Sequence, residues 1–267
     1  MKIILLLIAF TSLQVFAQEV TEFSIGDRVT MRSEVLQEDR VLNIYLPNGY
    51  SADSAHTYPV IYLLDGSVHE DFIHIAGLVQ FGSFPWIHFV PECIVVGIEN
   101  VDRTRDFTGE TSDSLHKAEY PQMGGSKHFI QFLKSEVFAY IEANYKTTTE
   151  RTIIGQSLGG LLATEILLND PDMFSNYIIV SPSLWFDYES YLDVELMPST
   201  SPLKVYVGVG EEGKIMKSVA KKLRKKLKKS LKASDQLYWG FFKDNDHGDV
   251  LHLAVYDAFE KMFAPKE

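Results

Sequence analysis

Two patterns of hydrophobic residues divide this chain. Residues 20–46 alternate between apolar and polar positions, as antiparallel strands with one exposed face do. Further along, unbroken apolar runs are typical of parallel strands that are buried on both faces. These runs lie at residues 58–64, 93–98, 152–154, 177–180 and 203–207, and a last strand is predicted at 236–242.

Helical periodicity fills most of the intervals between these strands. It predicts helices over residues 126–145, 158–168, 215–232 and 250–263. Residues 110–125 show little periodicity and are expected to form a long loop. Strands that alternate with helices predict an α/β fold, with a mostly parallel sheet, helices on both faces and an antiparallel N-terminal strand pair. The length fits one such domain over residues 18–267.

One strand-to-helix junction carries a nucleophile motif. A β-branched strand runs into Gly155-Gln-Ser157-Leu-Gly159, and a helical pattern follows. This G-x-S-x-G pattern is typical of a nucleophile elbow, in which a sharp turn strains the serine backbone. We expect both flanking glycines because a Cβ atom there would collide with the neighbouring strand or helix. Ser157 is the predicted nucleophile, and the backbone N–H groups of Leu158 and Ser67 are the predicted oxyanion hole.

Charge excludes one class of partner. The formal net charge of −11 argues against nucleic acid, and a hydrophobic content of 46% is enough for a sizeable core. The positive charge is concentrated in the predicted helix 215–232, which holds nine lysines and arginines. Apolar residues recur there every four positions, so the lysines are expected to form the solvated side of a helix packed on the sheet. Weak attraction to anionic surfaces is the alternative.

The first 17 residues have the pattern of a secretory signal. Lys2 provides the positive start, residues 3–10 are apolar, and a small-residue cleavage site ends at Ala17. A membrane-spanning helix needs roughly 20 apolar residues, and polar residues from Thr11 onward interrupt this stretch too early. The sequence predicts export to the periplasm or medium, a mature chain starting at Gln18, and no stable membrane anchor.

The predicted nucleophile needs a base and an acid. A serine hydroxyl attacks efficiently when a histidine takes its proton and an acid orients that histidine. In an α/β-hydrolase arrangement the acid and then the histidine follow the nucleophile along the chain, each after the carboxyl end of a strand. His247 directly follows the strand at 236–242, whereas His252 lies inside the last predicted helix, so His247 is the expected base.

Three carboxylates are candidates for the acid. Glu211 and Glu212 both follow the strand at 203–207. Adjacent residues on an extended turn point in opposite directions, so only one of them can face His247. Asp187 is the third candidate, although it follows the strand next to that of the nucleophile, one position too early.

Five motifs resemble those of a known enzyme family. They are Leu63-Leu-Asp-Gly66, Asn100 with Arg103-Thr-Arg-Asp106, Gly155-Gln-Ser-Leu-Gly-Gly160, Ser181-Pro-Ser-Leu-Trp185 and Asp246-His-Gly248. In this order they resemble the putative esterase family of the α/β-hydrolases, which holds enterochelin-type esterases, esterase D-like enzymes and feruloyl esterases. The resemblance implies that Ser157 is the nucleophile and His247 the base, with no metal or organic cofactor.

The resemblance also bears on the acid. The glutamate at this place in the family is often followed by glycine and, shortly after, by a methionine. Glu212-Gly213 with Met216 fits that pattern better than Glu211 does. Glu212 is therefore the predicted acid.

Three further residues are candidates for substrate binding by the same resemblance, because the arginine-rich loop and the tryptophan lie near the substrate in such folds. They are Arg103, Arg105 and Trp185. Alternatively, the arginines pair with nearby carboxylates and the tryptophan belongs to the core.

The sequence therefore predicts an exported serine hydrolase that cleaves a small-molecule carboxylic ester through an acyl-enzyme. An acyltransferase that uses an alcohol instead of water is one alternative. A non-catalytic binding protein on a hydrolase fold is another, because fold does not fix function. The physiological ester and the oligomeric state stay open.

Overall fold

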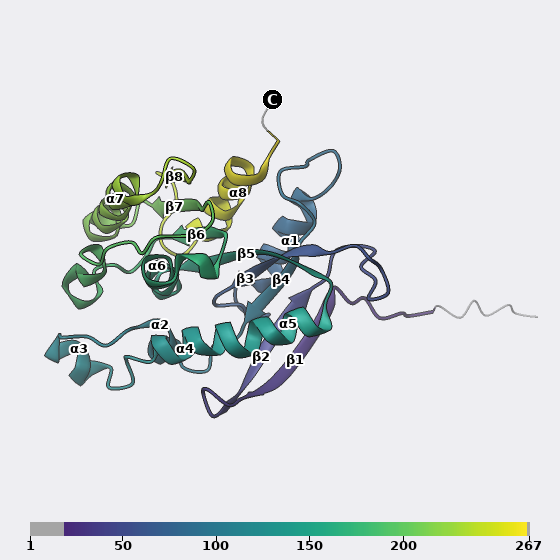
Figure 1. Cartoon of the computed structure of the whole chain (residues 1–267), viewed down its shortest axis with the longest axis horizontal. Helices are drawn as coiled ribbons and strands as arrows, with labels where there is room; N and C mark the ends of the chain where they lie inside the picture. Colours follow the sequence, from purple (N-terminus) through teal and green to yellow (C-terminus); the bar gives the residue numbers. More distant parts are fainter. Residues whose placement is uncertain (1–18, 266–267) are drawn as a thin grey trace, which may run out of the picture.

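Eight strands form one twisted sheet in the order β1-β2-β4-β3-β5-β6-β7-β8 (Figure 1). The computed structural model describes residues 19–265, so the predicted signal segment lies outside it. β1 pairs with β2 and β2 with β4 in antiparallel register, whereas the remaining neighbours are parallel. The strands are β1 Gly26–Ser33, β2 Glu38–Tyr45, β3 Tyr58–Leu63, β4 Ile94–Ile98, β5 Thr147–Gln156, β6 Asn176–Val180, β7 Lys204–Gly210 and β8 Gln236–Phe242. The predicted α/β class and the antiparallel N-terminal pair are confirmed.

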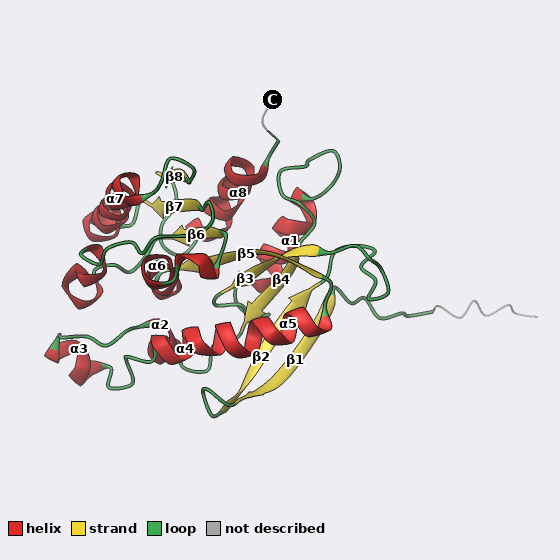
Figure 2. Cartoon of the chain, viewed as in Figure 1, coloured by secondary structure: helices red, strands yellow, loops and turns green. Residues whose placement is uncertain are grey.

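Helices cover both faces of this sheet, as predicted (Figure 2). Side chains of α1 and α8 pack against one face, and side chains of α4, α5, α6 and α7 pack against the other. The α-helices are α1 Phe72–Gly82, α2 Arg103–Phe107, α3 Ser114–Glu119, α4 Ser126–Phe132, α5 Phe138–Asn144, α6 Leu158–Asn169, α7 Gly213–Ser230 and α8 Val250–Phe263. Within residues 19–265, no helix is long and apolar enough to cross a membrane.

Four helical regions differ from the prediction, and one of them is the short helix α2, which was not predicted. The helix predicted at 126–145 is one continuous helix, but a π-turn at Leu133–Val137 joins α4 to α5. The predicted loop at 110–125 contains the short helix α3. Helix α1 was not predicted, because its apolar residues lie on its exposed side as well as its buried side and leave no amphipathic stripe. Ile73 and Phe81, for example, are 48% and 41% exposed.

The carboxyl ends of the parallel strands form one edge, and the loops that follow them meet there. Leu63 of β3 pairs with Ile154 of β5, and Gly210 of β7 pairs with Phe242 of β8. The chain leaves β3 toward β4 on one side and returns in β5 on the other side of β3. A crevice opens at such a switch in direction, and it is where α/β sheets bind ligands. The residues after β3 and β5 lie at this switch in direction.

Candidate active site

The backbone of Ser157 has the strained geometry of a nucleophile elbow. Its φ of 58° and ψ of −119° are unusual for a residue with a Cβ atom. A Cβ atom on Gly155 would lie 2.4 Å from the carbonyl oxygen of Gly159, so glycine is required there. The same expectation for Gly159 is wrong, because a Cβ on it would meet Asp65 and Leu64 no closer than 3.4 Å. The tight second position is Gly160, which packs against the residues after β6.

Glu212 and His247 are in direct contact. His247 Nδ1 lies 2.6 Å from Glu212 Oε2, and the Glu212 side chain is 1% exposed while that of His247 is 47% exposed. The hydroxyl of Ser181 and the backbone N–H of Gly210 (2.8 Å) donate to the other oxygen of the carboxylate. Burial raises the pKa of Glu212, but the hydrogen bonds with His247, Ser181 and Gly210 together outweigh burial and lower it. The carboxylate is therefore held ionised against one nitrogen of the imidazole, which leaves Nε2 to accept a proton.

The other two candidates for the acid point elsewhere. Glu211 is in an ion pair with Lys217, and its backbone N–H donates to the carbonyl of Asn245 (2.7 Å). Asp187 accepts hydrogen bonds from the Thr111 hydroxyl (2.8 Å) and from the backbone N–H of Ser112 (2.7 Å). Its carboxylate anchors the loop before α3 and does not contact His247.

The hydroxyl of Ser157 forms a hydrogen bond with that of a second serine. Ser157 Oγ lies 3.2 Å from Ser183 Oγ, and the Ser183 N–H donates to the Ser157 carbonyl (3.0 Å). Among the hydrogen bonds of residues 19–265, none joins Ser157 to His247. The structure brings both side chains to the same edge of the sheet. Hydrogen bonds between a nucleophile and its base often tighten only when substrate binds.

Three positioning residues were missed in the sequence. Gln156, the residue before the nucleophile, donates from its amide to the carbonyl of His247 (2.6 Å) and so ties the β8 loop to the elbow. Ser181 holds Glu212, and Ser183 holds Ser157. The signal was available, because Ser181-Pro-Ser183 directly follows β6 at the carboxyl edge.

The two predicted oxyanion donors follow β3 and β5, the strands at the switch in direction. Leu158 is the first residue of α6, where a backbone N–H has no partner within its own helix. The N–H of Ser67 follows β3 and donates to Glu70 over 3.4 Å, a long hydrogen bond that a substrate oxygen could replace. The neighbouring Gly66 N–H is engaged by the carbonyl of Ile98 (3.0 Å).

The two candidate arginines occupy different environments. Arg103 donates through Nε (2.7 Å) and Nη2 (2.9 Å) to Asp65, and its Nη2 also approaches the carbonyl of Gln156 at 3.4 Å, beside the nucleophile. Arg105 donates through Nε to Asp106 (2.7 Å) and through both terminal nitrogens to Glu38. The structure therefore brings Arg103 to the site. It does not bring Arg105 there, because two carboxylates take up its donors.

Trp185 lies near the nucleophile, two residues after Ser183, and is 40% exposed, so it is not a core residue. Its ring meets that of His116 edge-on with centroids 6.0 Å apart, and His116 stacks on Phe186. The segment around α3 therefore packs against the tryptophan. The rings of His116, Trp185 and Phe186 thus form an aromatic cluster in the segment after β6.

His252 belongs to a second cluster, between α1 and α8. Its ring meets that of His74 edge-on at 4.1 Å, and its Nε2 lies 3.7 Å from Asp71. Burial and then His74 lower the pKa of His252, whereas burial, Asp65 and Glu70 raise the pKa of Asp71 to about 6. In the part of the chain that the structure describes, no group of three or more His, Cys, Asp or Glu side chains could hold a metal ion.

Comparison with known proteins places the chain in a family of esterases. A family model described as Putative esterase matches residues 33–242, which is most of the chain. The chain belongs to the putative esterase family. Its relatives include the ferri-bacillibactin esterase BesA of Bacillus subtilis (strain 168), which is 33% identical over 171 residues. That alignment covers 60% of this chain and 59% of BesA, so the chain spans less than two thirds of this relative.

Solved structures similar to this chain have the same fold. The IroE-like serine hydrolase from Shewanella oneidensis is 30% identical with a TM-score of 0.80, over 89% of this chain and 79% of that chain. The BES protein from Bacillus cereus is 25% identical with a TM-score of 0.81, over 92% of this chain and 98% of that chain. The esterase fold therefore extends well beyond the elbow.

Proposed function

We propose that this protein hydrolyses a small-molecule carboxylic ester with Ser157, His247 and Glu212. The contact between His247 Nδ1 and the buried carboxylate of Glu212 carries the proposal. It holds the imidazole in the tautomer that a serine nucleophile needs, at the edge where the strained elbow presents Ser157. Membership of the putative esterase family supports the same reaction.

The proposed reaction has two halves. Ser157 Oγ attacks the ester carbonyl while His247 Nε2 takes its proton, and the N–H groups of Leu158 and Ser67 hold the oxyanion. His247 then passes the proton to the leaving alcohol, and the acid stays attached to the serine as an ester. Water, activated by the same imidazole, releases the acid and restores the hydroxyl. Glu212 stabilises the imidazolium that forms in each half.

The proposed substrate site lies between Arg103 and Trp185. Arg103, whose charge is paired with Asp65, lies beside the elbow at 3.4 Å from the Gln156 carbonyl, and Trp185 offers a partly exposed ring two residues after Ser183. An ester with a hydrogen-bond-accepting group and an aromatic or apolar group suits this pair. Siderophore esters are the first class to test, because BesA is named a ferri-bacillibactin esterase.

The test combines active-site labelling with product analysis. A fluorophosphonate probe should label Ser157, as peptide mass spectrometry would show, and ferri-bacillibactin and nitrophenyl acetate should release their acids. Labelling at another residue, or no hydrolysis of any ester in a panel, would overturn the proposal. Acyl transfer to an added alcohol in preference to water would instead identify an acyltransferase.

We also propose that the protein is exported. The support is the signal pattern of residues 1–17, with Lys2, the apolar stretch and the site at Ala17. Intact mass spectrometry of the secreted or periplasmic fraction should find a chain that starts at Gln18. An active pool that retains Met1 in the cytoplasm would contradict export.

A further inference from the structure

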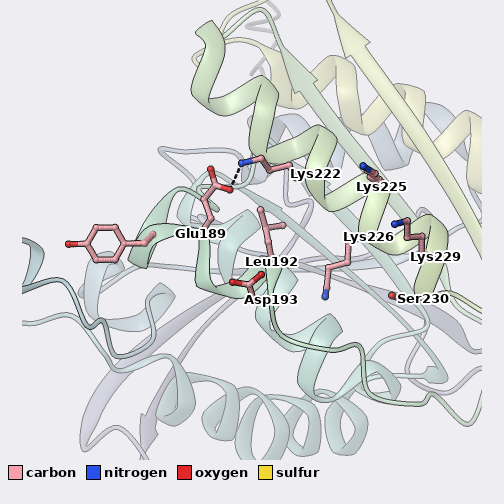
Figure 3. A pocket seen from close by; sticks show the side chains of 9 residues that line it. Glu189, Leu192, Asp193, Lys222, Lys225, Lys226, Lys229 and Ser230 are labelled. Atoms are coloured by element: carbon pink, nitrogen blue, oxygen red, sulfur yellow. Dashed lines mark hydrogen bonds and ion pairs between the residues drawn. The ribbon is translucent and has the colours of Figure 1, made fainter.

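A lysine-lined hollow lies between α7 and the segment after Trp185, outside the proposed active site (Figure 3). Its volume is about 490 Å³, which is in the range of small-molecule sites. One wall comes from the segment before Leu196 and the other from the second half of α7. The lining residues are Tyr188, Glu189, Leu192, Asp193, Lys222, Lys225, Lys226, Lys229 and Ser230.

The charge of α7 is unusual for this chain. Nine of the 25 lysines and arginines lie in this 18-residue helix, which has no acidic residue, although the chain as a whole carries −11. The apolar stripe that packs on the sheet is confirmed, with Val219, Leu223 and Leu227 buried. The expectation that the lysines form only a solvated side is incomplete, because four of them line the hollow.

The lysines of the hollow are mostly without carboxylate partners. Lys222 forms an ion pair with Glu189 across the hollow (Figure 3). Within residues 19–265, Lys225, Lys226 and Lys229 form no ion pair. The hollow thus contains four positive and two negative side chains. Like charges three and four residues apart on a helix repel one another, so an anion between them would relieve this repulsion.

The opposite wall is shaped by a left-handed turn. Asp187, Tyr188 and Glu189 have φ values of 46°, 57° and 66°, although none is glycine. The hydrogen bonds from Thr111 and Ser112 to Asp187 hold the first residue of this turn. The turn carries Glu189 toward α7 and closes one end of the hollow with an ion pair.

We propose that this hollow binds a polyanion with several phosphate groups, either a soluble polyphosphate or the headgroups of an anionic lipid surface. Lysine ammonium groups are compact charges on flexible stems, and they bind phosphate without demanding one fixed geometry. Residues spaced by three and four on α7 lie about 5–6 Å apart, so they can meet neighbouring phosphates together. At physiological salt the electrostatic effect of a charge extends only about 8 Å. The nearby lysines therefore outweigh the distant acidic residues in setting the electrostatic potential of the hollow.

A pair of matched double variants separates this hollow from the general charge of the helix. Lys225→Gln with Lys229→Gln removes two charges that line the hollow, and Lys221→Gln with Lys228→Gln removes two from the same helix outside it. Calorimetry with inorganic tripolyphosphate and co-sedimentation with phosphatidylglycerol vesicles, with phosphatidylcholine vesicles as the blank, measure binding. Neither requires ester turnover, so the result is independent of the proposed function.

At physiological salt the wild type and the Lys221/Lys228 variant should bind at least one probe, and the Lys225/Lys229 variant should bind it at least tenfold more weakly. Binding of tripolyphosphate would identify a soluble ligand, whereas binding of the anionic vesicles alone would identify lipid headgroups. Equal weakening by both double variants would overturn the site in favour of diffuse helix charge. Absence of binding to both probes at millimolar concentration would overturn it as well. Circular dichroism melting of both variants checks that the fold is retained.

Discussion

Two buried carboxylates at the carboxyl edge of the sheet have opposite kinds of partner. Glu212 and Asp106 both have side chains that are 1% exposed. Glu212 faces His247, which is nearly half exposed and can gain or lose a proton. Asp106 faces Arg40 (2.7 Å), whose side chain is completely buried, and Arg105. An arginine keeps its proton at any pH that a protein survives.

The difference teaches that burial of a carboxylate does not by itself identify an active site. The cluster of Arg40, Asp106, Arg105 and Glu38, here called the arginine cluster, also places the Arg40 guanidinium 5.2 Å from the ring of Phe129. Every charge in it is paired, and its two cations are arginines, which keep their protons. It ties β2 to α2, which is a structural task. The pair of Glu212 and His247 keeps one nitrogen available, and this availability is what catalysis requires.

The largest expected effect comes from the nucleophile. Ser157→Ala should lower the kcat for an activated ester by about 10⁴–10⁶ and leave the melting temperature within about 2 °C of the wild type. The control is Ser183→Ala, which removes the hydroxyl partner of Ser157 and should cost less than about tenfold. Stopped-time assays of both variants measure this. Equal losses in the two would show that the wrong serine is assigned.

The next largest effect is expected from the carboxylate that faces the histidine. Glu212→Gln should reduce kcat by about 10³–10⁴, because the amide cannot stabilise the imidazolium or fix its tautomer. Glu211→Gln is the matched control, since Glu211 is bound to Lys217 and should keep near-wild-type activity. If the two losses were reversed, the acid would be Glu211. Small losses in both variants would show that the contact between Glu212 and His247 is not needed for catalysis.

The arginine cluster should show the opposite behaviour. Asp106→Asn removes the charge between Arg40 and Arg105 and should lower the free energy of unfolding by about 3–5 kcal/mol, the usual cost of breaking a buried pair. Ester hydrolysis by the folded fraction should stay unchanged. The control Asp39→Asn, in an exposed pair with Arg32, should cost about 0.2–1 kcal/mol. Urea unfolding with parallel kinetics tests this. A stable Asp106→Asn protein with a large loss of kcat would show that Asp106 acts in catalysis and not in stability.

The smallest effects concern pH, and two carboxylates should respond with opposite signs. Burial raises the pKa of Glu38, but hydrogen bonds from Arg105 and Arg40 outweigh it and lower the pKa. Its ionised form therefore stabilises the fold above pH 4.5, and this contribution is lost as the pH falls. Asp71 accepts no side-chain hydrogen bond within residues 19–265, and its pKa is raised to about 6. Its ionised form therefore destabilises the fold at neutral pH and ceases to do so once protonated.

Single variants test these signs by denaturant unfolding at pH 7.5 and 3.5. Glu38→Gln should cost about 1–3 kcal/mol at pH 7.5, the usual worth of a charged hydrogen bond, and less at pH 3.5. Asp71→Asn should stabilise by about 1–2 kcal/mol at pH 7.5, and this gain should vanish at pH 3.5. The same slope with pH in both variants would contradict the opposite environments described here.

The sequence by itself determined the backbone at several points. Apolar runs predicted the strands, because residues buried on both faces must be apolar throughout. The elbow at Ser157 was predicted from its glycines, and the required one, Gly155, lies within local contact of Gly159. The loop that holds His247 follows from the strand before it. In each case the signal lies within a short stretch of consecutive residues.

Only the tertiary structure decided which side chains meet. Arg105 reaches Glu38 across 67 positions of the chain, and Gln156 reaches His247 across 91. Whether Glu211 or Glu212 contacts the imidazole depends on how the loops after β7 and β8 pack together. Ser181 reaches Glu212 because β6 packs beside β7. A side chain takes the partner that folding brings within about 3 Å. Periodicity and motif spacing contain no such distances, so Arg103 and Arg105 looked equivalent in the sequence and proved to differ in the fold.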